Sequence, residues 1–392
     1  MTFESCRAAF VLPDRPGQAL IFGGGNRVLR GGGGDWAVLR EALQAHAVAG
    51  PDRPHPPGGL AGAFAYDGSF CFHVCPEAAL LPTDGFWPRL SEPDGGAGAP
   101  PAAGWRSEES PEVYAAMVRR AQAYIAAGDI YQVNLARRFA LAWPEGAGHA
   151  AGRDFFRHLW AATEAPCAAW AALPDGWLAS ASPELFLSIQ GRDITTRPIK
   201  GTRPRDRDPQ RDSQNAFDLA TSPKELAELI MITDLERNDL GRICEYGSVE
   251  VEGLAVREAF SHVHHLVSTV RGRLRADVDP VAAVQACFPG GSITGAPKLR
   301  AMEIIRELEP FDRGWFCGAA GWFGFDGSAQ FNIAIRTVAA GPQGLEFHAG
   351  CGITADSLPE AEFAETGHKA AAIEEAWSRF AEASRRGSGV PA

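Results

Sequence analysis

The order of strands and helices along the chain constrains the fold more than any other feature of the sequence. Strand-like segments, which are apolar runs bounded by glycine, proline or aspartate, follow one another in groups with helices between the groups. These segments are Phe10–Leu12, Ala19–Phe22, Gly62–Tyr66, Ile130–Leu135, Trp177–Ala181, Leu185–Ile189, Ile194–Ile199, Phe260–Arg271, Gly318–Phe325, Ala329–Val338 and Leu345–Ala349. Because strands and helices do not alternate regularly, the pattern predicts an α+β fold, with large, mainly antiparallel β-sheets in a sandwich-like core flanked by helices.

Residues that begin or end helices predict four of them. Ser110 and Pro111 fit the cap and the first position of a helix that stops at Gly128. A capping box, with proline at the first helical position, runs from Ser222 to Glu225 and predicts a second helix. The other two predicted helices are Pro297–Leu308 and one that begins near Pro359 with Ser357 as its cap.

The composition of residues 91–109 divides the chain. Glycine, proline and alanine dominate this stretch, as is typical of a linker. We therefore expect a β-rich N-terminal region at 1–90 that packs on the core, a linker at 91–109, a main domain at 110–382 and a flexible tail at 383–392.

Charge and cysteine content exclude several classes of function. The net charge of -11 leaves no basic surplus for a nucleic-acid partner, although a local Arg/Lys pocket can still bind a small anion. The eight cysteines include no Cys-x-x-Cys pair, so we expect free thiols in a reducing cytoplasm. We expect no membrane partner, because Met1–Phe10 lacks an apolar signal segment and no run of about 18 apolar residues occurs.

Two predicted helices carry a pair of glutamates three residues apart. The pairs are Glu225 with Glu228, and Glu362 with Glu365. Residues at this spacing lie on one helix face, so each pair can point into one site. Carboxylate oxygens are the ligands that Mg²⁺ prefers, and two such faces predict a Mg²⁺ site. The alternative is a pair of solvated helix surfaces.

Lys200 and Glu184 are candidates for covalent and acid–base chemistry. Lys200 follows the apolar strand Ile194–Ile199 and precedes a glycine turn, where partial desolvation would lower its pKa and make it nucleophilic. Glu184 begins a strand beside Leu185, and apolar surroundings would raise its pKa and make it a general acid. The alternatives are an exposed turn lysine and a glutamate on the surface of an edge strand.

Other residues suggest anion binding. Arg336 lies in the predicted strand Ala329–Val338 and can clamp a carboxylate, or else form a salt bridge at the rim. The glycine-rich turn Pro289–Lys298 offers free backbone N–H groups to an anion, and Lys298 adds positive charge. Among His262, His264 and His265, we expect one histidine in a pocket wall rather than a metal site.

Several segments resemble, in order, the motifs of the chorismate-utilising enzymes, the family of anthranilate synthase component I, aminodeoxychorismate synthase component I, isochorismate synthase and salicylate synthase. The segments are Gly128–Leu135, Ser182–Glu184, Arg197–Thr202, Asp234–Arg242, His265–Ser268, Phe288–Lys298 and Ala355–Glu362. The resemblance covers roughly residues 108–378. It implies the fold of that family, a Mg²⁺ cofactor, and a chorismate-binding catalytic domain at 110–382.

The resemblance also implies roles for the matching residues. Glu228 and Glu365 match the Mg²⁺ ligands, and Glu225 and Glu362 match the neighbouring glutamates that reach the metal through water. Glu184 matches the acid that protonates the leaving C4 hydroxyl of chorismate. The positions that match the substrate-binding wall of the pocket are Arg336, Thr202, Gly350, Gly352, Lys369, His265 and Gln132.

Two positions divide the family. Lys200 stands where anthranilate synthases usually have alanine, and Gln132 stands where isochorismate and salicylate synthases have a lysine base. The chain thus resembles the aminodeoxychorismate synthase component I branch, in which the lysine attacks C2 of chorismate, the C4 hydroxyl leaves, and ammonia attacks C4 and expels the lysine. This branch makes 4-amino-4-deoxychorismate for p-aminobenzoate and folate, and it implies a separate glutamine amidotransferase subunit that supplies ammonia. Anthranilate synthase component I is the nearest alternative, and a non-catalytic chorismate-binding regulator is another.

Overall fold

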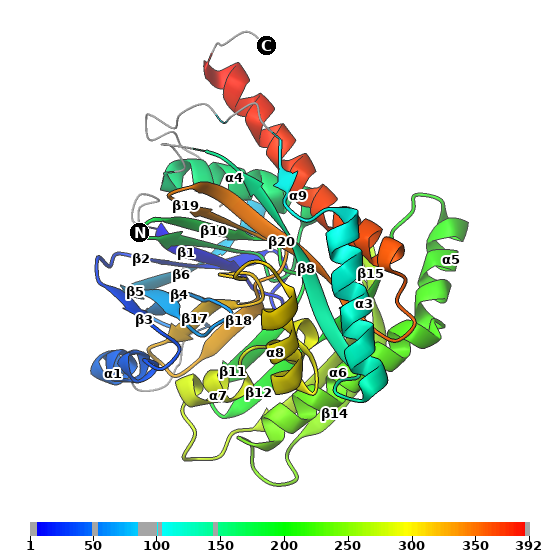
Figure 1. Ribbon diagram of the computed structural model, residues 1–392. Helices are drawn as coiled ribbons and strands as arrows, with labels where there is room; N and C mark the ends of the chain where they lie inside the picture. The colour runs from blue at the N-terminus through cyan, green and yellow to red at the C-terminus, as the bar shows by residue number, and fades with distance from the viewer. Residues whose placement is uncertain (1–5, 49–53, 85–99, 101–103, 144–147, 389–392) are drawn as a thin grey trace.

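Two ten-stranded β-sheets form the centre of the molecule (Figure 1). The computed structural model describes residues 6–48, 54–84, 100, 104–143 and 148–388. All strand pairs within the described residues are antiparallel. With helices packed around the sheets, this confirms the predicted α+β class and its large antiparallel sheets.

The first sheet joins strands from all parts of the chain. Its order is β16 (Gly295–Ala296), β8 (Gln132–Leu141), β20 (Gly344–Ile353), β19 (Thr337–Gly341), β10 (Gly176–Ser180), β9 (Ala169–Leu173), β1 (Cys6–Val11), β2 (Gln18–Gly23) and β6 (Glu77–Pro82), and β7 (Arg106–Ser107) pairs with β8. The N-terminal strands therefore enter this sheet through the pairing of β1 with β9.

The second sheet is built in the same way. Its order is β13 (Ile199–Pro204), β15 (Val263–Arg273), β12 (Asp193–Arg197), β11 (Leu185–Gln190), β18 (Ala329–Ile333), β17 (Ala319–Gly324), β4 (Gly59–Phe64), β5 (Phe70–Cys75) and β3 (Val28–Gly31), and β14 (Glu250–Ala259) pairs with β15. Here the N-terminal strands enter through the pairing of β4 with β17.

Alanine is frequent among the side chains packed between the two sheets. Ala8 and Ala171 of the first sheet share one buried cluster with Ala61 and Ala320 of the second. Because alanine projects only a methyl group from a strand, the sheets can face each other closely while their inner surfaces stay packed.

Helices cover the outer faces. On the first sheet, α4 (His149–Thr163) packs against α9 (Pro359–Ser388), and Phe155 of α4 contacts both Trp177 of β10 and Trp377 of α9. The helix α6 (Pro223–Gly241) packs on β15 of the second sheet, and α3 (Pro111–Ala127) lies beside α9 (Figure 1). The other helices are α1 (Ala37–His46), α5 (Pro209–Ala220), α7 (Pro280–Cys287), α8 (Lys298–Leu308) and the 3₁₀ turn η2 (Gly291–Ile293).

The helix signals in the sequence mostly correspond to real helix ends. The Ser110 and Ser222 hydroxyls accept hydrogen bonds from the Val113 and Glu225 amides at the starts of α3 and α6, and Gly128 ends α3 with φ 82°. The predicted cap of α9 lies one residue too early, because the helix begins at Pro359; the Ser357 hydroxyl accepts from the Thr354 amide and donates to Glu362 Oε1 at 2.7 Å.

Two predicted strands are broken. Ala329–Val338 is two strands, β18 and β19, which belong to different sheets and are joined by a crossing at 334–336. The prediction that Arg336 lies within a strand is therefore wrong, and its backbone is left-handed with φ 50°. Ile194–Ile199 is likewise divided at Pro198 into β12 and β13.

The predicted domain limits remain a prediction. Residues 85–99 and 101–103, which include most of the proposed linker, lie outside the described residues, as do residues 389–392 of the proposed tail. The helix α9 continues past residue 382 to Ser388. No helix in the described ranges is long and apolar enough to cross a membrane.

Candidate active site

A cavity of about 730 Å³ opens between the ends of the two sheets and the helices α6 and α9. Of the catalytic, substrate-binding and metal-binding residues that the family resemblance implies, all except Gln132 contribute to its lining. They are Glu184, Lys200, Thr202, Glu225, Glu228, His265, Arg336, Gly350, Gly352, Glu362, Glu365 and Lys369. The fold therefore brings together residues from β13, β15, β20, α6 and α9 that lie far apart in the sequence.

Four carboxylates line the cavity where α6 and α9 face it. Lys224 Nζ lies 4.0 Å from Glu228 Oε1 on α6 and 3.7 Å from Glu362 Oε1 on α9, so one ammonium joins the two helices. Burial raises the pKa of Glu228, and the charges of Glu225 and Glu362 raise it further. This crowding of oxygen donors suits a hard divalent cation such as Mg²⁺, which would relieve their mutual repulsion.

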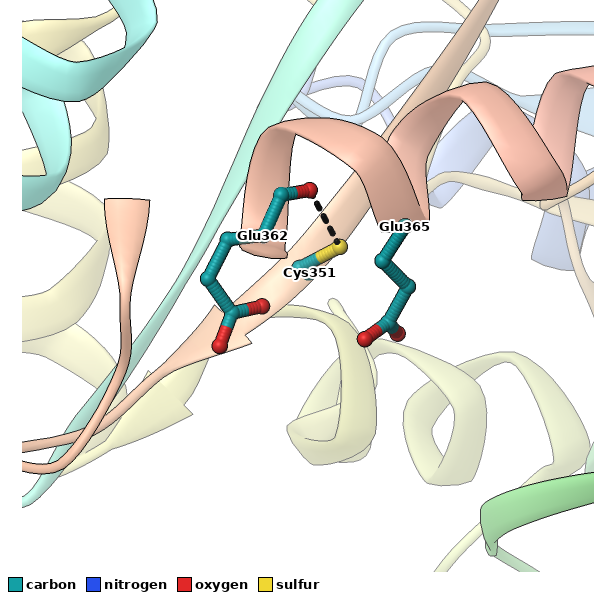
Figure 2. Close-up of side chains that lie close together, drawn as sticks. All are labelled: Cys351, Glu362 and Glu365. Carbon is teal, nitrogen blue, oxygen red and sulfur yellow. Dashed lines mark hydrogen bonds between the residues drawn. The ribbon is translucent and has the colours of Figure 1, made fainter. Parts of the chain in front are cut away.

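Cys351 lies between the two glutamates of α9, as Figure 2 shows. One ligand atom each from Cys351, Glu362 and Glu365 lies within 4.8 Å of the others, and the thiol donates to the Glu362 carbonyl oxygen at 3.5 Å. Burial raises the pKa of Cys351 to about 12, so the sulfur is a neutral thiol at pH 7. Mg²⁺ prefers oxygen, and the carboxylates rather than the sulfur are its fitting ligands.

Glu184 and Lys200 share a neighbour, Ser292. Glu184 is buried, and this burial raises the pKa of its carboxyl group to about 7 against the opposing effects of the Ser292 side chain and the Lys200 charge. Lys200 Nζ donates to the Ser292 carbonyl oxygen at 3.2 Å. The predicted turn after Lys200 is a bulge inside β13, where Gly201 has φ 70° and the register with β15 shifts.

Arg336 and Lys369 add positive charge to the cavity lining. Arg336, with its left-handed backbone, lines the cavity from the crossing between the sheets. Lys369 Nζ donates to the Gly350 carbonyl oxygen at 2.9 Å and pairs with Glu365 Oε1 at 2.7 Å. A strained non-glycine backbone is retained where the surroundings enforce it, here to aim a guanidinium into the cavity.

His265 is a neutral base in the cavity wall. Its Nδ1 lies 2.9 Å from the Gly201 carbonyl oxygen and 3.1 Å from Thr202 Oγ1. A carbonyl oxygen only accepts, so Nδ1 carries the proton and the buried Nε2, which has no partner among the described residues, does not. Burial lowers the pKa of His265 to about 4. His264 pairs with Asp212 instead, so His265 is the one member of the predicted histidine cluster that lines the cavity, which His348 and His368 also line.

Gln132 lies behind the lining rather than in it. Its Nε2 is 1.9 Å from the position that a Cβ would occupy at Gly352, and Asn134 Oδ1 is 2.5 Å from the same position at Gly350. The two amides on β8 thus fill the space above the two glycines of β20, and any side chain there would displace them. Asn134 itself lines the cavity.

Sequence reasoning missed Ser292, Asn134 and Lys224 as lining residues. The position of Asn134, two residues after Gln132 in a strand, was a usable signal because alternate residues share a face. Lys298, expected to bind an anion from outside, pairs with Asp239 at 2.5 Å and is not part of the lining.

Known proteins resemble this chain in both sequence and structure. Residues 70–375 match the sequence profile of a family described as chorismate binding enzyme. Aminodeoxychorismate synthase component 1 of Klebsiella aerogenes is 49% identical over 262 residues, which are 67% of this chain and 57% of that protein. Anthranilate synthase component 1 of Streptomyces coelicolor is 45% identical over 271 residues, 69% of this chain and 52% of that protein.

Among solved structures, anthranilate synthase component I from Streptococcus pneumoniae TIGR4 superposes with a TM-score of 0.77 at 26% identity. The superposition covers 91% of this chain and 92% of that one. In the two sequence comparisons, by contrast, the matched part spans little more than half the length of the relatives.

Proposed function

This chain belongs to the family of chorismate binding enzymes, and we propose that it acts as component I of an aminodeoxychorismate synthase. In this proposal it converts chorismate and ammonia to 4-amino-4-deoxychorismate, the precursor of p-aminobenzoate and folate. The observation that carries the proposal is the placement of Lys200 and Glu184 against the same residue, Ser292, in one cavity. The amine of Lys200 and the carboxyl group of Glu184 then face one substrate. The Glu184 carboxyl group can carry a proton near pH 7.

In the proposed reaction the amine and the acid act together. As the bond from Lys200 Nζ to C2 of chorismate forms, the C4–O bond breaks and Glu184 gives its proton to the departing hydroxyl, which leaves as water. Ammonia then forms a bond to C4, and the C2–Nζ bond breaks to release the lysine. Covalent attachment divides one difficult displacement into two easier ones.

Other groups bind and orient the substrate. Glu225, Glu228, Glu362 and Glu365 would hold Mg²⁺, which supplies positive charge to a substrate carboxylate. Arg336, Lys369 and the backbone at Gly350 and Gly352 would bind the other carboxylate. Thr202 and His265 contact each other in the wall beside Lys200. The region 110–382 would form the catalytic domain.

The ammonia source is part of the proposal. Several relatives are named component 1, which indicates a second component. We propose that a separate glutamine amidotransferase subunit delivers ammonia, and that the complex works in the cytoplasm.

The test is a product analysis of the purified chain with chorismate, Mg²⁺ and ammonium at alkaline pH. Liquid chromatography with mass spectrometry should show 4-amino-4-deoxychorismate, and omission of Mg²⁺ should stop its formation. Anthranilate as the product would replace the proposal with anthranilate synthase component I. Unchanged chorismate would favour a binding protein without catalysis.

A further inference from the structure

We propose that Ser292 is a positioning residue that holds Glu184 and Lys200 in place for catalysis, and that the helix α6 fixes Ser292. This inference rests on the proposed function. Ser292 lies in the 3₁₀ turn η2 and is 6% exposed. Its side chain lies beside the Glu184 carboxylate, whose pKa it lowers, and its carbonyl oxygen accepts from Lys200 Nζ at 3.2 Å. One residue therefore lies against both the acid that precedes β11 and the amine on β13.

The turn that carries Ser292 is anchored by a buried carboxylate. Glu236 of α6 accepts from the Gly291 amide at 2.9 Å through Oε1. The helix packs so closely that a Cβ at Gly291 would lie 2.6 Å from Leu235 Cδ2 and 3.0 Å from Glu236 Oε1. The sequence suggested that the backbone N–H groups of this glycine-rich turn bind an anionic ligand. In the structure the Gly291 N–H instead binds the Glu236 carboxyl group of the protein itself.

A second clamp holds the entrance to the turn. Asp239, one helical turn after Glu236, pairs with Lys298, whose Nζ also donates to the Cys287 carbonyl oxygen at 2.9 Å and to the Pro289 carbonyl oxygen at 2.8 Å. On the far side, Thr294 Oγ1 donates to the Gly290 carbonyl oxygen at 3.1 Å. With both ends tied, Ser292 has little freedom to move away from Glu184.

The electrostatic surroundings of Glu184 define what Ser292 can change. The charged and titratable groups that face the carboxylate are Lys200, Arg336, Glu236, Cys167 and Cys317. The Ser292 side chain favours the charged form of Glu184, so its removal should raise the pKa of that carboxyl group. A general acid with a higher pKa stays protonated to higher pH.

The experiment compares Ser292→Ala, Ser292→Thr and the wild type at a fixed concentration of free ammonia. We expect Ser292→Ala to lower kcat by about 10²-fold, the scale of one acid–base group, while KM for chorismate changes little. The alkaline limb of the kcat–pH profile should move to higher pH. Ser292→Thr, which keeps the hydroxyl, should restore both.

Ser328→Ala is the matched control, because Ser328 is also 6% exposed and bonds to Asp326 outside the cavity lining. Its kcat and pH profile should match the wild type. A parallel pair tests the anchor: kcat should fall further in Glu236→Leu than in Glu236→Gln, since glutamine keeps an acceptor for Gly291.

Wild-type kcat in Ser292→Ala would overturn the inference. So would a lower kcat with an unmoved alkaline limb and no rescue by Ser292→Thr, because that result describes damage to packing. Failure of the proposed function would be detected separately, because the wild-type protein would then form a product other than 4-amino-4-deoxychorismate. If that product is anthranilate, the same comparison is made on its formation.

Discussion

At the scale of single residues, Lys200 is the group on which the choice of branch depends. Its ammonium lies in the field of Glu184 and Glu228, and it reaches the Ser292 carbonyl oxygen. A cation bound at the α6 and α9 carboxylates would weaken the negative field of Glu228 at Lys200. Glu228 would therefore link the proposed metal site to the proposed nucleophile.

Replacement of this lysine should remove the covalent route. Lys200→Ala should lower the rate of 4-amino-4-deoxychorismate formation by on the order of 10³-fold or more, the scale for loss of a nucleophile. Wild-type protein quenched with chorismate in the absence of ammonia should carry a mass adduct on the peptide that contains Lys200, and the variant should carry none. A variant with an unchanged rate would show that the amine is not a nucleophile.

Much of the site could be predicted from the residues, because helix spacing and motif order place Glu225, Glu228, Glu362 and Glu365 without coordinates. The parts that could not be predicted depend on contacts between distant segments. Ser292 meets Glu184 only after β11 and the turn before α8 are packed together, and no local pattern encodes that. Arg336 was expected in a regular strand, but the chain crosses between sheets there.

At the scale of elements, α6 serves two purposes. Its first turns present Glu225 and Glu228 to the cavity, and its later turns present Glu236 and Asp239 to the segment that carries Ser292. A helix is stiff over this length, so the distance between the Glu225 and Glu228 carboxylates and the 3₁₀ turn η2, which carries Ser292, stays constant. The motif Asp234–Arg242 therefore has a structural role: it anchors the segment that carries Ser292.

Glu236 should make stability depend on pH. Burial raises the pKa of this carboxyl from 4.5 to about 7, and its Oε2 has no partner among the described residues. The folded state therefore holds the proton more tightly than the unfolded state, and stability from this group is lost as pH rises from 4.5 to about 7.

Glu236→Gln removes this titration. The variant should gain on the order of 3 kcal/mol or less relative to wild type at pH 8, and the gain should shrink towards pH 5. Calorimetric Tm values at the two pH values measure the difference. Glu250→Gln, at an exposed position in β14, is the control and should give the same Tm difference from wild type at both. A gain for Glu236→Gln that is equal at pH 5 and pH 8 would contradict the role of burial.

Element prediction succeeded where local chemistry determines the ends. Ser110 and Ser222 cap the starts of α3 and α6 with hydrogen bonds that form within one turn, and Gly128 caps the end of α3 in the same way. The helices α5 and α7 were not predicted, although Asp208 and Asp279 cap them before a proline in the same way. Strand breaks at Pro198 and 334–336 were not predictable, because the partner strands decide where pairing stops.

At the scale of the whole molecule, the sheets join the two ends of the sequence. Ala8, Ala9 and Phe10 of β1 pair with β9, and all of β4 pairs with β17. Each sheet is therefore completed by strands from before and after the proposed linker. A division at residues 90 and 110 follows the composition of the chain but cuts across both sheets.

This pairing predicts that residues 110–392 do not fold alone. Loss of the first 109 residues would leave β9 and β17 each with one unpaired edge. It would also expose to water the alanine side chains that are packed between the sheets. The truncated chain should aggregate or lack a cooperative thermal transition. Co-expression with residues 1–109 as a separate chain should recover soluble protein, since the missing strands are then supplied in trans. A monomeric, cooperatively unfolding 110–392 fragment would instead show that the N-terminal strands are an accessory layer, and that the catalytic region holds its own core.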